Sequence, residues 1–217
     1  MKKYILVIAL YSAVAACGQS SVQAQSQTQN QTTVKMPDAP KAQGTRAEAI
    51  FAGGCFWCIE SDFEKLPGVY EAISGYTGGH AANPTYKQVS HGGTGHYEAA
   101  KIIYDPKVVS YSELLEYFWI HVDPMDAGGQ FCDRGQPYET AIFASEEQLE
   151  TARASKASLQ KSGRLESDVV TPILEAQPFY RAEKYHQDYY KKNPVRYKYY
   201  RTRCGRDKRV KKIWGAH

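Results

Sequence analysis

The amino-acid sequence predicts an α/β (α+β) protein: a two-layer sandwich of a mixed or antiparallel sheet and helices, in a single domain with long ordered loops and an irregular C-terminal tail. Three observations support this fold class. Strand-like and helix-like patterns alternate along the chain, the segments between them have lengths typical of antiparallel connections, and no internal repeat is present. The 217 residues allow one domain of ordinary size with appendages.

Residues 1–16 have the pattern of a secretory signal. Lys2-Lys3 form a basic start, Tyr4–Ala13 is an apolar run too short for a permanent membrane span, and small residues precede Cys17. The end of this run resembles the bacterial lipoprotein signal, in which the cysteine becomes the lipidated first residue. The alternative is an ordinary cleaved signal with an incidental cysteine. We expect export to the bacterial cell envelope, facing the periplasm, with membrane contact only through lipid on Cys17.

Residues 17–45 are rich in Gln, Ser and Thr, and no aromatic residue occurs between Tyr11 and Phe51. Such a segment cannot bury enough apolar surface to offset the entropy cost of ordering it, so we expect a flexible tether. The folded domain is expected over residues 46–217, which is long enough for one sizeable core.

The first half of this domain has strand patterns separated by glycine- and proline-rich turns. A strand over Ala47–Ala52 leads into a glycine pair, and a helix is expected over about Cys55–Lys65. After a turn at Pro67-Gly68, the further expected elements are a strand over Val69–Tyr76, a long ordered loop over Thr77–Gly95 and a strand over Tyr97–Tyr104.

Capping patterns mark two helices in the second half. Ser110-x-x-Glu113 and Ser145-x-x-Gln148 are capping boxes. One face of the first helix is predicted to be core: Leu114, Leu115, Phe118, Trp119 and Val122. The other expected elements are a glycine-rich loop up to Pro137, a strand over Thr140–Ala144, the second helix up to about Lys161, an edge strand over Val169–Ala176 that contains Pro172, and a helix over Glu183–Lys192 with mostly irregular chain beyond it.

The segment from Gly53 to Cys58 places two thiols at the start of the first helix. A helix N-terminus favours a thiolate and lowers a cysteine pKa, so Cys55 is a candidate nucleophile. Phe56 and Trp57 beside it provide an apolar wall for a small uncharged group. The alternative is a buried structural cysteine in an aromatic core.

The chain has five cysteines and is expected in an oxidising compartment. If Cys17 carries lipid, Cys55, Cys58, Cys132 and Cys204 remain, and two structural disulfides are possible. A Cys-x-x-Cys at a helix start is more often a redox pair than a structural bridge. A zinc site is less favoured because no second Cys-x-x-Cys and no His-x-x-x-His completes a ligand set, so we expect no metal.

Loops near the predicted strand ends carry phenols and carboxyls suited to acid–base chemistry. Tyr86 follows a turn-forming Asn-Pro-Thr, Glu98 stands at the start of a strand, and Asp133 and Tyr138 lie in one loop. Each has a plain structural explanation by itself, as a surface acid, a packed tyrosine or a turn. Together with the thiol segment they indicate a reaction site.

With these residues the chain resembles the A-type peptide methionine sulfoxide reductases, which act on the S epimer of the sulfoxide. The resemblance covers nearly everything from Ala47 to Trp214. It is carried by Gly54-Cys55-Phe56-Trp57, Gly75-Tyr76-Thr77-Gly78-Gly79, Asn83-Pro84-Thr85-Tyr86, Gly95-His96-Tyr97-Glu98, Asp133-Arg134-Gly135-x-x-Tyr138, and Phe179-Tyr180-x-x-Glu183 through His186-Gln187 and Lys192-Asn193-Pro194. The resemblance implies repair of oxidised proteins that carry methionine S-sulfoxide, action on free methionine sulfoxide, a thioredoxin-like dithiol reductant and no cofactor.

The chemistry requires a nucleophilic thiolate and proton donors aimed at one oxygen, because a sulfoxide releases its oxygen only when that oxygen is protonated as sulfur is attacked. Cys55 is the predicted nucleophile, and Glu98, Tyr86 and Tyr138 are the predicted donors. An apolar neighbourhood would raise the pKa of Glu98 and keep it in the donor form.

Other nearby residues are given supporting roles. Phe56 and Trp57 are predicted to hold the substrate methyl group, and Asp133 is predicted to orient partners or water. In the resemblance, His96 and His186 are structural neighbours of the site.

Attack leaves a sulfenic acid on Cys55, and a second thiol then forms a disulfide that an external dithiol reduces. Cys58 lies one helical turn away, and Cys204 lies in the expected irregular tail. Both are candidates for the resolving thiol, alone or in relay, with Cys132 less favoured. Cys58 departs from the commonest family pattern, because many relatives have glycine there and some have a cysteine in place of Ser90.

Two other functions fit parts of the sequence. A thiol-disulfide oxidoreductase would use Cys55 and Cys58 as its dithiol and would have no need of Glu98. A non-enzymatic, lipid-anchored binding protein would leave the clustered phenols and acids unexplained.

The C-terminal segment is basic: Arg181–His217 holds 13 Lys/Arg against 3 Asp/Glu, interleaved with tyrosines. This pattern is compatible with nucleic-acid binding. For an exported protein we instead expect a solvated basic face and no nucleic-acid partner, with weak attraction to anionic lipid headgroups as a further option. A monomer is the expected state.

Overall fold

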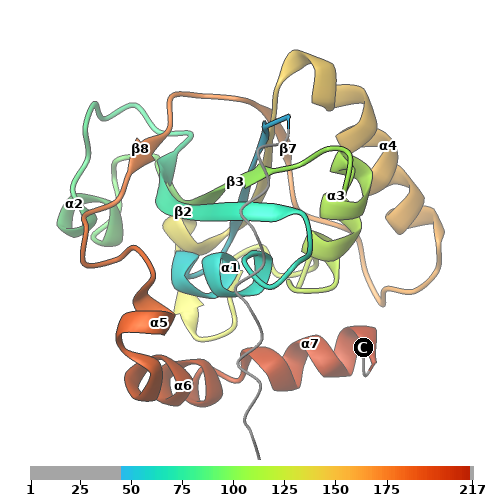
Figure 1. Cartoon of the computed structure of the whole chain (residues 1–217). Helices are drawn as coiled ribbons and strands as arrows, with labels where there is room; N and C mark the ends of the chain where they lie inside the picture. The colour runs from blue at the N-terminus through green and yellow to red at the C-terminus, as the bar shows by residue number, and fades with distance from the viewer. Residues whose placement is uncertain (1–44, 216–217) are drawn as a thin grey trace, which may run out of the picture. The chain divides into compact units, whose positions relative to one another are not determined.

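A six-stranded sheet forms the centre of this computed structural model, which describes residues 45–215 (Figure 1). β6 and β7 pair in parallel, and the other neighbouring strands are antiparallel. The predicted fold class, a mixed sheet with helices, is confirmed. In spatial order the strands are β7 (Ile173–Glu175), β6 (Thr140–Ala144), β1 (Ala47–Gly53), β3 (Tyr97–Tyr104), β2 (Val69–Thr77) and β8 (Tyr180–Arg181).

The two faces of the sheet are buried against different partners, as strand alternation requires. On one face, alternate residues such as Phe51 and Ile102 pack against α1 (Phe56–Phe63) and α3 (Tyr111–Trp119). The predicted core face is confirmed, because the four apolar residues on α3 and Val122 just beyond its end are all buried. The opposite face packs against the segment around Phe179.

Local sequence signals explain where the helices begin. Ser110 and Ser145 cap α3 and α4 (Glu146–Lys161) with the predicted capping boxes. The expected loop over Thr77–Gly95 also contains a short helix, α2 (Tyr86–Ser90), which was not predicted. Its signal is a third capping box, formed by Thr85 and Gln88.

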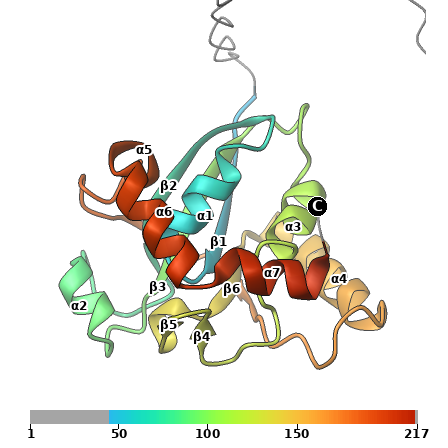
Figure 2. The same cartoon turned by 90° about the horizontal axis from the view of Figure 1, so that it is seen from below.

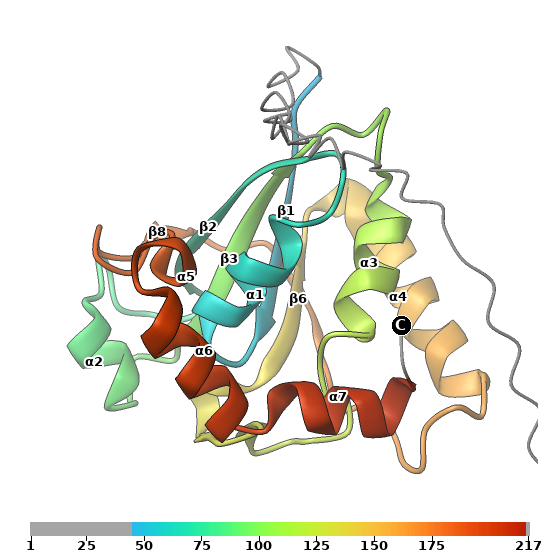
Figure 3. The same cartoon turned by 60° about the horizontal axis from the view of Figure 1, so that its bottom comes forward.

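The C-terminal expectations are partly wrong. The expected helix over Glu183–Lys192 is reduced to α5 (Tyr189–Lys192), because Asp188 takes a left-handed conformation with φ of 54°. The tail beyond it is helical and not irregular: α6 (Pro194–Arg203) passes beside α1, and α7 (Arg206–Trp214) follows it toward α3 (Figures 2 and 3). Pro at the first position of α6 and a left-handed Gly205 between the helices are the local signals for them. The edge strand expected over Val169–Ala176 is present but shorter, as β7 (Ile173–Glu175).

The predicted signal over residues 1–16, the lipidation of Cys17 and the tether over residues 17–45 lie outside the described residues, apart from Thr45. Between residues 45 and 215, no helix combines the length and apolar character that crossing a membrane requires.

Candidate active site

The turn between β1 and α1 positions a thiol at the start of the helix. Gly54 has a φ of 81°, and a Cβ there would come within 2.6 Å of the Gln130 Cβ, so only glycine fits. Cys55 follows as the residue preceding α1 and is 7% exposed. The glycine pair therefore ends β1 and holds Cys55 just beyond the C-terminal end of this central strand.

Cys55 borders a small cavity of about 60 Å³. Side chains from α1, α2, β3, β5, α6 and the 3-10 helix η1 (Gln136–Tyr138) meet here although they are far apart in sequence. The cavity brings together every residue predicted as nucleophile, proton donor, orienting carboxylate or apolar wall, and it adds Tyr200. The lining residues are Cys55, Phe56, Trp57, Tyr86, Glu98, Asp133, Tyr138 and Tyr200.

Glu98 enters the cavity as a neutral acid. Its side chain is buried at the start of β3, and the Phe56 N–H donates to its Oε2 at 3.0 Å. Burial raises the pKa of Glu98 to about 8, and the negative charge of Asp133 adds to this effect against the lowering by the Phe56 hydrogen bond. At neutral pH the carboxyl therefore holds a proton that it can donate.

The two thiols of α1 form a hydrogen-bonded pair. Burial raises the pKa of Cys55 well above its ordinary value, and its interaction with Cys58 adds to this increase. The same hydrogen bond lowers the pKa of Cys58 to about 7. The expectation of a low pKa on Cys55 is therefore wrong for the resting protein, because desolvation outweighs the helix end.

Two phenols reach the cavity from separate elements. Tyr86 begins α2, and Tyr138 ends η1. Burial raises the pKa of both hydroxyls, that of Tyr86 to about 12, so both keep their protons. Glu183 anchors α2 here, because its carboxylate accepts hydrogen bonds from the Tyr86 N–H and the Tyr76 hydroxyl, each at 2.8 Å. This anchoring role of Glu183 was not predicted from the sequence.

The apolar wall is fixed by its neighbours. The Trp57 indole N–H donates to His186 Nδ1 at 3.0 Å, and the indole stacks on Tyr189 with ring centroids 3.7 Å apart. Burial lowers the pKa of His186 to about 4, so this ring is neutral at pH 7 and acts as an orienting acceptor. His96 is also buried, and its Nδ1 accepts from the Gly79 N–H at 3.1 Å.

Asp133 lies in β5 (Asp133–Arg134), which pairs with β4 (Gly129–Gln130). The Tyr200 hydroxyl on α6 donates a hydrogen bond to Asp133 Oδ2. Burial raises the pKa of Asp133 above its usual value, while the Tyr200 hydrogen bond and the charge of Arg206 act in the opposite direction. Tyr200 was missed because the tail was expected to be irregular; its only sequence signal was the concentration of tyrosines there.

The four described cysteines fall into two pairs. Cys132 and Cys204 form a disulfide with their Cα atoms 4.8 Å apart. Cys55 and Cys58 are free thiols. Of the two candidates for the resolving thiol, Cys58 therefore lies beside Cys55, and Cys204 is covalently bonded elsewhere.

Comparison with known proteins shows the family. A family model for peptide methionine sulfoxide reductase matches residues 47–217, which is most of the chain.

The chain belongs to the peptide methionine sulfoxide reductase family. The resemblance seen in the sequence is thereby confirmed.

Individual relatives agree over nearly the same length. Peptide methionine sulfoxide reductase MsrA of Bacillus subtilis is 53% identical over 169 residues, covering 77% of this chain and 96% of that protein. MsrA 2 of Caulobacter vibrioides is 50% identical over 180 residues, covering 82% of this chain and 91% of that protein. Among solved structures, reduced Mxr1 from Saccharomyces cerevisiae has 30% identity and a TM-score of 0.65, covering 69% of this chain and 87% of that one. Methionine sulfoxide reductase A of Corynebacterium diphtheriae has 31% identity and a TM-score of 0.62, covering 71% and 78%.

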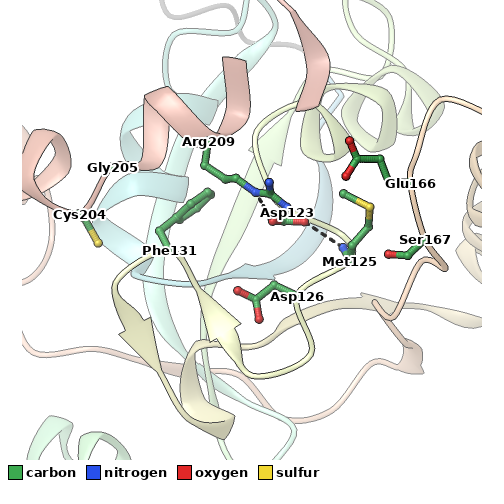
Figure 4. Close-up of a pocket in the computed structure, with 9 residues that line it drawn as sticks. All are labelled: Asp123, Met125, Asp126, Phe131, Glu166, Ser167, Cys204, Gly205 and Arg209. Carbon is green, nitrogen blue, oxygen red and sulfur yellow. Dashed lines mark hydrogen bonds and ion pairs between the residues drawn. The ribbon is translucent and has the colours of Figure 1, made fainter. Parts of the chain in front are cut away.

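This family member has a second, larger cavity of about 720 Å³ beside Cys204 (Figure 4). Its polar groups are largely paired: Arg209 donates to Asp123 Oδ2 at 2.6 Å, and Asp126 accepts from Arg134. The cavity has no free thiol among its lining residues, since Cys204 is in the disulfide. The smaller cavity at Cys55 is therefore the candidate active site.

Two groups of described residues bring possible metal ligands together, and neither suits an ion. In the first group, Cys132 and Cys204 are bonded to each other beside Asp133. In the second, Glu60 lies with Glu64 and Asp188, and the Lys191 ammonium already pairs with both of the latter, at 2.5 and 2.8 Å.

Proposed function

We propose that this chain reduces methionine S-sulfoxide, in oxidised proteins and as the free amino acid, to methionine. One observation carries the proposal: a protonated, buried Glu98 borders the same small cavity as Cys55, whose thiol is hydrogen-bonded to that of Cys58. Family membership supports the reaction type. A site with an apolar wall for the methyl group and proton donors for the oxygen selects one epimer, and the resemblance to the A-type enzymes supports the S epimer.

The first steps transfer oxygen from substrate to enzyme. Cys55 loses its thiol proton to solvent and attacks the sulfoxide sulfur as a thiolate, while Glu98 protonates the sulfoxide oxygen and the two phenols hydrogen-bond to it. The sulfur–oxygen bond of the substrate then breaks, methionine leaves, and Cys55 carries the oxygen as a sulfenic acid. The apolar wall holds the methyl group during attack.

The next step closes a disulfide between Cys55 and Cys58. The Cys58 thiol attacks the sulfenic sulfur and displaces the oxygen as water, forming the sulfur–sulfur bond. Cys58 is favoured over Cys204 because its N–H already donates to the Cys55 carbonyl at 3.0 Å and its thiol contacts Cys55. An external dithiol protein of the thioredoxin type then reduces the disulfide and is itself oxidised.

Replacing Cys58 with serine is expected to leave the first turnover intact and to slow recycling by a dithiol protein at least about tenfold, because serine cannot form the disulfide. The same variant supplied with dithiothreitol is the matched control and is expected to recycle, because a small dithiol reduces the sulfenic acid directly. The measurement is methionine formed per enzyme with a thioredoxin as reductant, since a small dithiol can reduce a sulfenic acid directly. A C58S variant that recycles like wild type would contradict the resolving role.

The reaction itself is tested with racemic methionine sulfoxide and dithiothreitol. Consumption is expected to stop at half of the substrate, because only the S epimer reacts. A thiol-disulfide oxidoreductase would consume none and would reduce a protein disulfide instead. Complete consumption would contradict the epimer assignment, and no consumption would contradict the proposed function.

The cellular setting is part of the proposal. The N-terminal pattern supports export and anchoring at the cell-envelope membrane by lipid on Cys17, facing the periplasm, and we propose a monomer there. Mass spectrometry of the mature N-terminus tests this, and an unmodified chain that starts beyond Cys17 would contradict it.

A further inference from the structure

The C-terminal helices supply one wall of the catalytic cavity through a single side chain. Tyr200 is the only residue of α6 that lines the cavity. Its hydroxyl donates to Asp133, and its ring meets Trp57 edge-on with centroids 5.8 Å apart. The position of Tyr200 therefore affects both the orienting carboxylate and the apolar wall.

The Cys132–Cys204 disulfide joins the same two segments that this hydrogen bond joins. Cys132 directly precedes Asp133, and Cys204 follows Tyr200 by one helical turn at the end of α6. The Cys132 N–H also lies 3.2 Å from the Cys204 sulfur. The β4–β5 hairpin and the C-terminal end of α6 are thus connected by the disulfide and by the Tyr200–Asp133 hydrogen bond (Figure 2).

The disulfide is not what holds the C-terminal helices on the domain. Arg201 pairs with Asp62 of α1 at 2.7 Å, and Arg206 donates to the Gly53 and His121 carbonyls at 3.0 Å each. Arg206 is 2% exposed, so these bonds are shielded from water. What the disulfide adds is local, because it limits how far Asp133 can move from Tyr200.

The location of the Asp133 charge matters to the groups around it. Arg206 and Tyr200 favour the ionised form of Asp133, whereas burial opposes it. The same charge raises the pKa of Glu98 and, more weakly, that of the Cys55 thiol. It also acts on the two phenols, Tyr86 and Tyr138, that border the cavity.

We propose that Tyr200 is a positioning residue for Asp133, and that the Cys132–Cys204 disulfide keeps the two at hydrogen-bonding distance so that Asp133 can orient the substrate. This inference rests on the proposed function. The disulfide then has a structural role beside the cavity, and the redox steps take place at Cys55 and Cys58. No bond to sulfur is made or broken at Cys132 or Cys204 during turnover.

The test is a double-mutant cycle of wild type, Y200F, C132S/C204S and the triple variant. Single turnovers of methionine S-sulfoxide are measured without reductant, after mass spectrometry has shown free Cys55 and Cys58 and, where present, an intact disulfide. Y200F keeps the ring and is expected to lower the single-turnover rate at subsaturating substrate about tenfold. C132S/C204S is expected to lower it by a similar factor, and adding Y200F to it is expected to cost less than about twofold more.

Equal costs of Y200F with and without the disulfide would overturn the proposal, as would wild-type rates in C132S/C204S. Tyr199→Phe is the matched control, because this neighbouring tyrosine is 69% exposed on the same helix, and it is expected to behave as wild type.

The pH profile separates positioning from a merely structural role. Removing the Tyr200 hydroxyl takes away a group that lowers the Asp133 pKa. The acidic limb of the rate profile in Y200F is therefore expected to move to higher pH, and an unmoved limb would overturn the positioning role.

A measurement that does not depend on catalysis distinguishes failure of the proposed function from failure of the role assigned to the disulfide. Amide hydrogen exchange over residues 128–135 is expected to be at least about tenfold faster in C132S/C204S than in wild type, with α1 unchanged. If wild type fails to reduce the sulfoxide but shows this exchange difference, the proposed function is wrong and the disulfide still holds the hairpin. Unchanged exchange would overturn the role of the disulfide.

Discussion

Replacing Cys55 with serine (C55S) is expected to abolish methionine formation, including the first turnover. A serine hydroxyl in this buried position has no neighbouring base strong enough to ionise it, and a sulfoxide cannot pass its oxygen to it as a sulfenic acid. The loss is expected to exceed about 10⁴-fold in the single-turnover rate. Methionine formed per enzyme, measured without reductant, is the readout.

Cys58→Ser is the matched control for C55S. It changes a thiol of the same buried pair, one helical turn away, and is expected to keep the first turnover. Survival of a single turnover in C55S would mean that another group attacks the sulfoxide, and the proposed mechanism would be wrong.

Replacing Glu98 with glutamine (E98Q) is expected to lower the single-turnover rate about 10²-fold, because the carboxyl is the strongest proton donor facing the cavity. The amide keeps the size and the hydrogen bond from the Phe56 N–H and cannot donate an acidic proton. The two phenols are weaker donors, since burial raises their pKa values and keeps their protons on oxygen.

The pH dependence of the rate tests the same role of Glu98 as the proton donor. With a pKa of about 8, Glu98 holds its proton at neutral pH and loses it as the pH rises through that value. The wild-type rate is therefore expected to fall above about pH 8, and E98Q is expected to lack this alkaline limb. A limb that persists in E98Q would assign it to another group.

Stability distinguishes a lost proton donor from a damaged fold. The pKa of Glu98 is higher in the folded protein than the ordinary value of 4.5, so its contribution to stability is full at low pH and is lost as the pH rises from about 4.5 to about 8. E98Q removes the need to bury a charge. Its free energy of unfolding above pH 8 is therefore expected to exceed that of wild type, measured by denaturant titration.

Several elements could be predicted because their signals are local. The glycine pair before Cys55 limits the backbone to one sharp turn, and Ser110 and Ser145 begin their helices with capping boxes. The strand expected over Ala47–Ala52 is present as β1. The catalytic cavity could be predicted in content, since the resemblance named seven of its eight lining residues.

The parts that failed depend on contacts between distant segments. α6 has little apolar periodicity of its own, and it forms because Tyr197 is buried against the thiol pair and Arg201 pairs with Asp62. Tyr200 enters the cavity only because α6 passes beside α1. The partner of Cys204 could not be chosen from spacing either, because 72 residues separate it from Cys132.

The sequence by itself determined that a thiol follows β1 at a helix start, that phenols and carboxyls accompany it, and which family the chain resembles. These features rest on local geometry and residue type. The tertiary structure decided that the two thiols act on each other, because burial raises the pKa of Cys55 and the hydrogen bond between them lowers that of Cys58 to about 7. It also decided that Cys204 joins Cys132 and that Tyr200 meets Asp133. All three outcomes depend on desolvation or on distances between residues that exist only once the chain has folded.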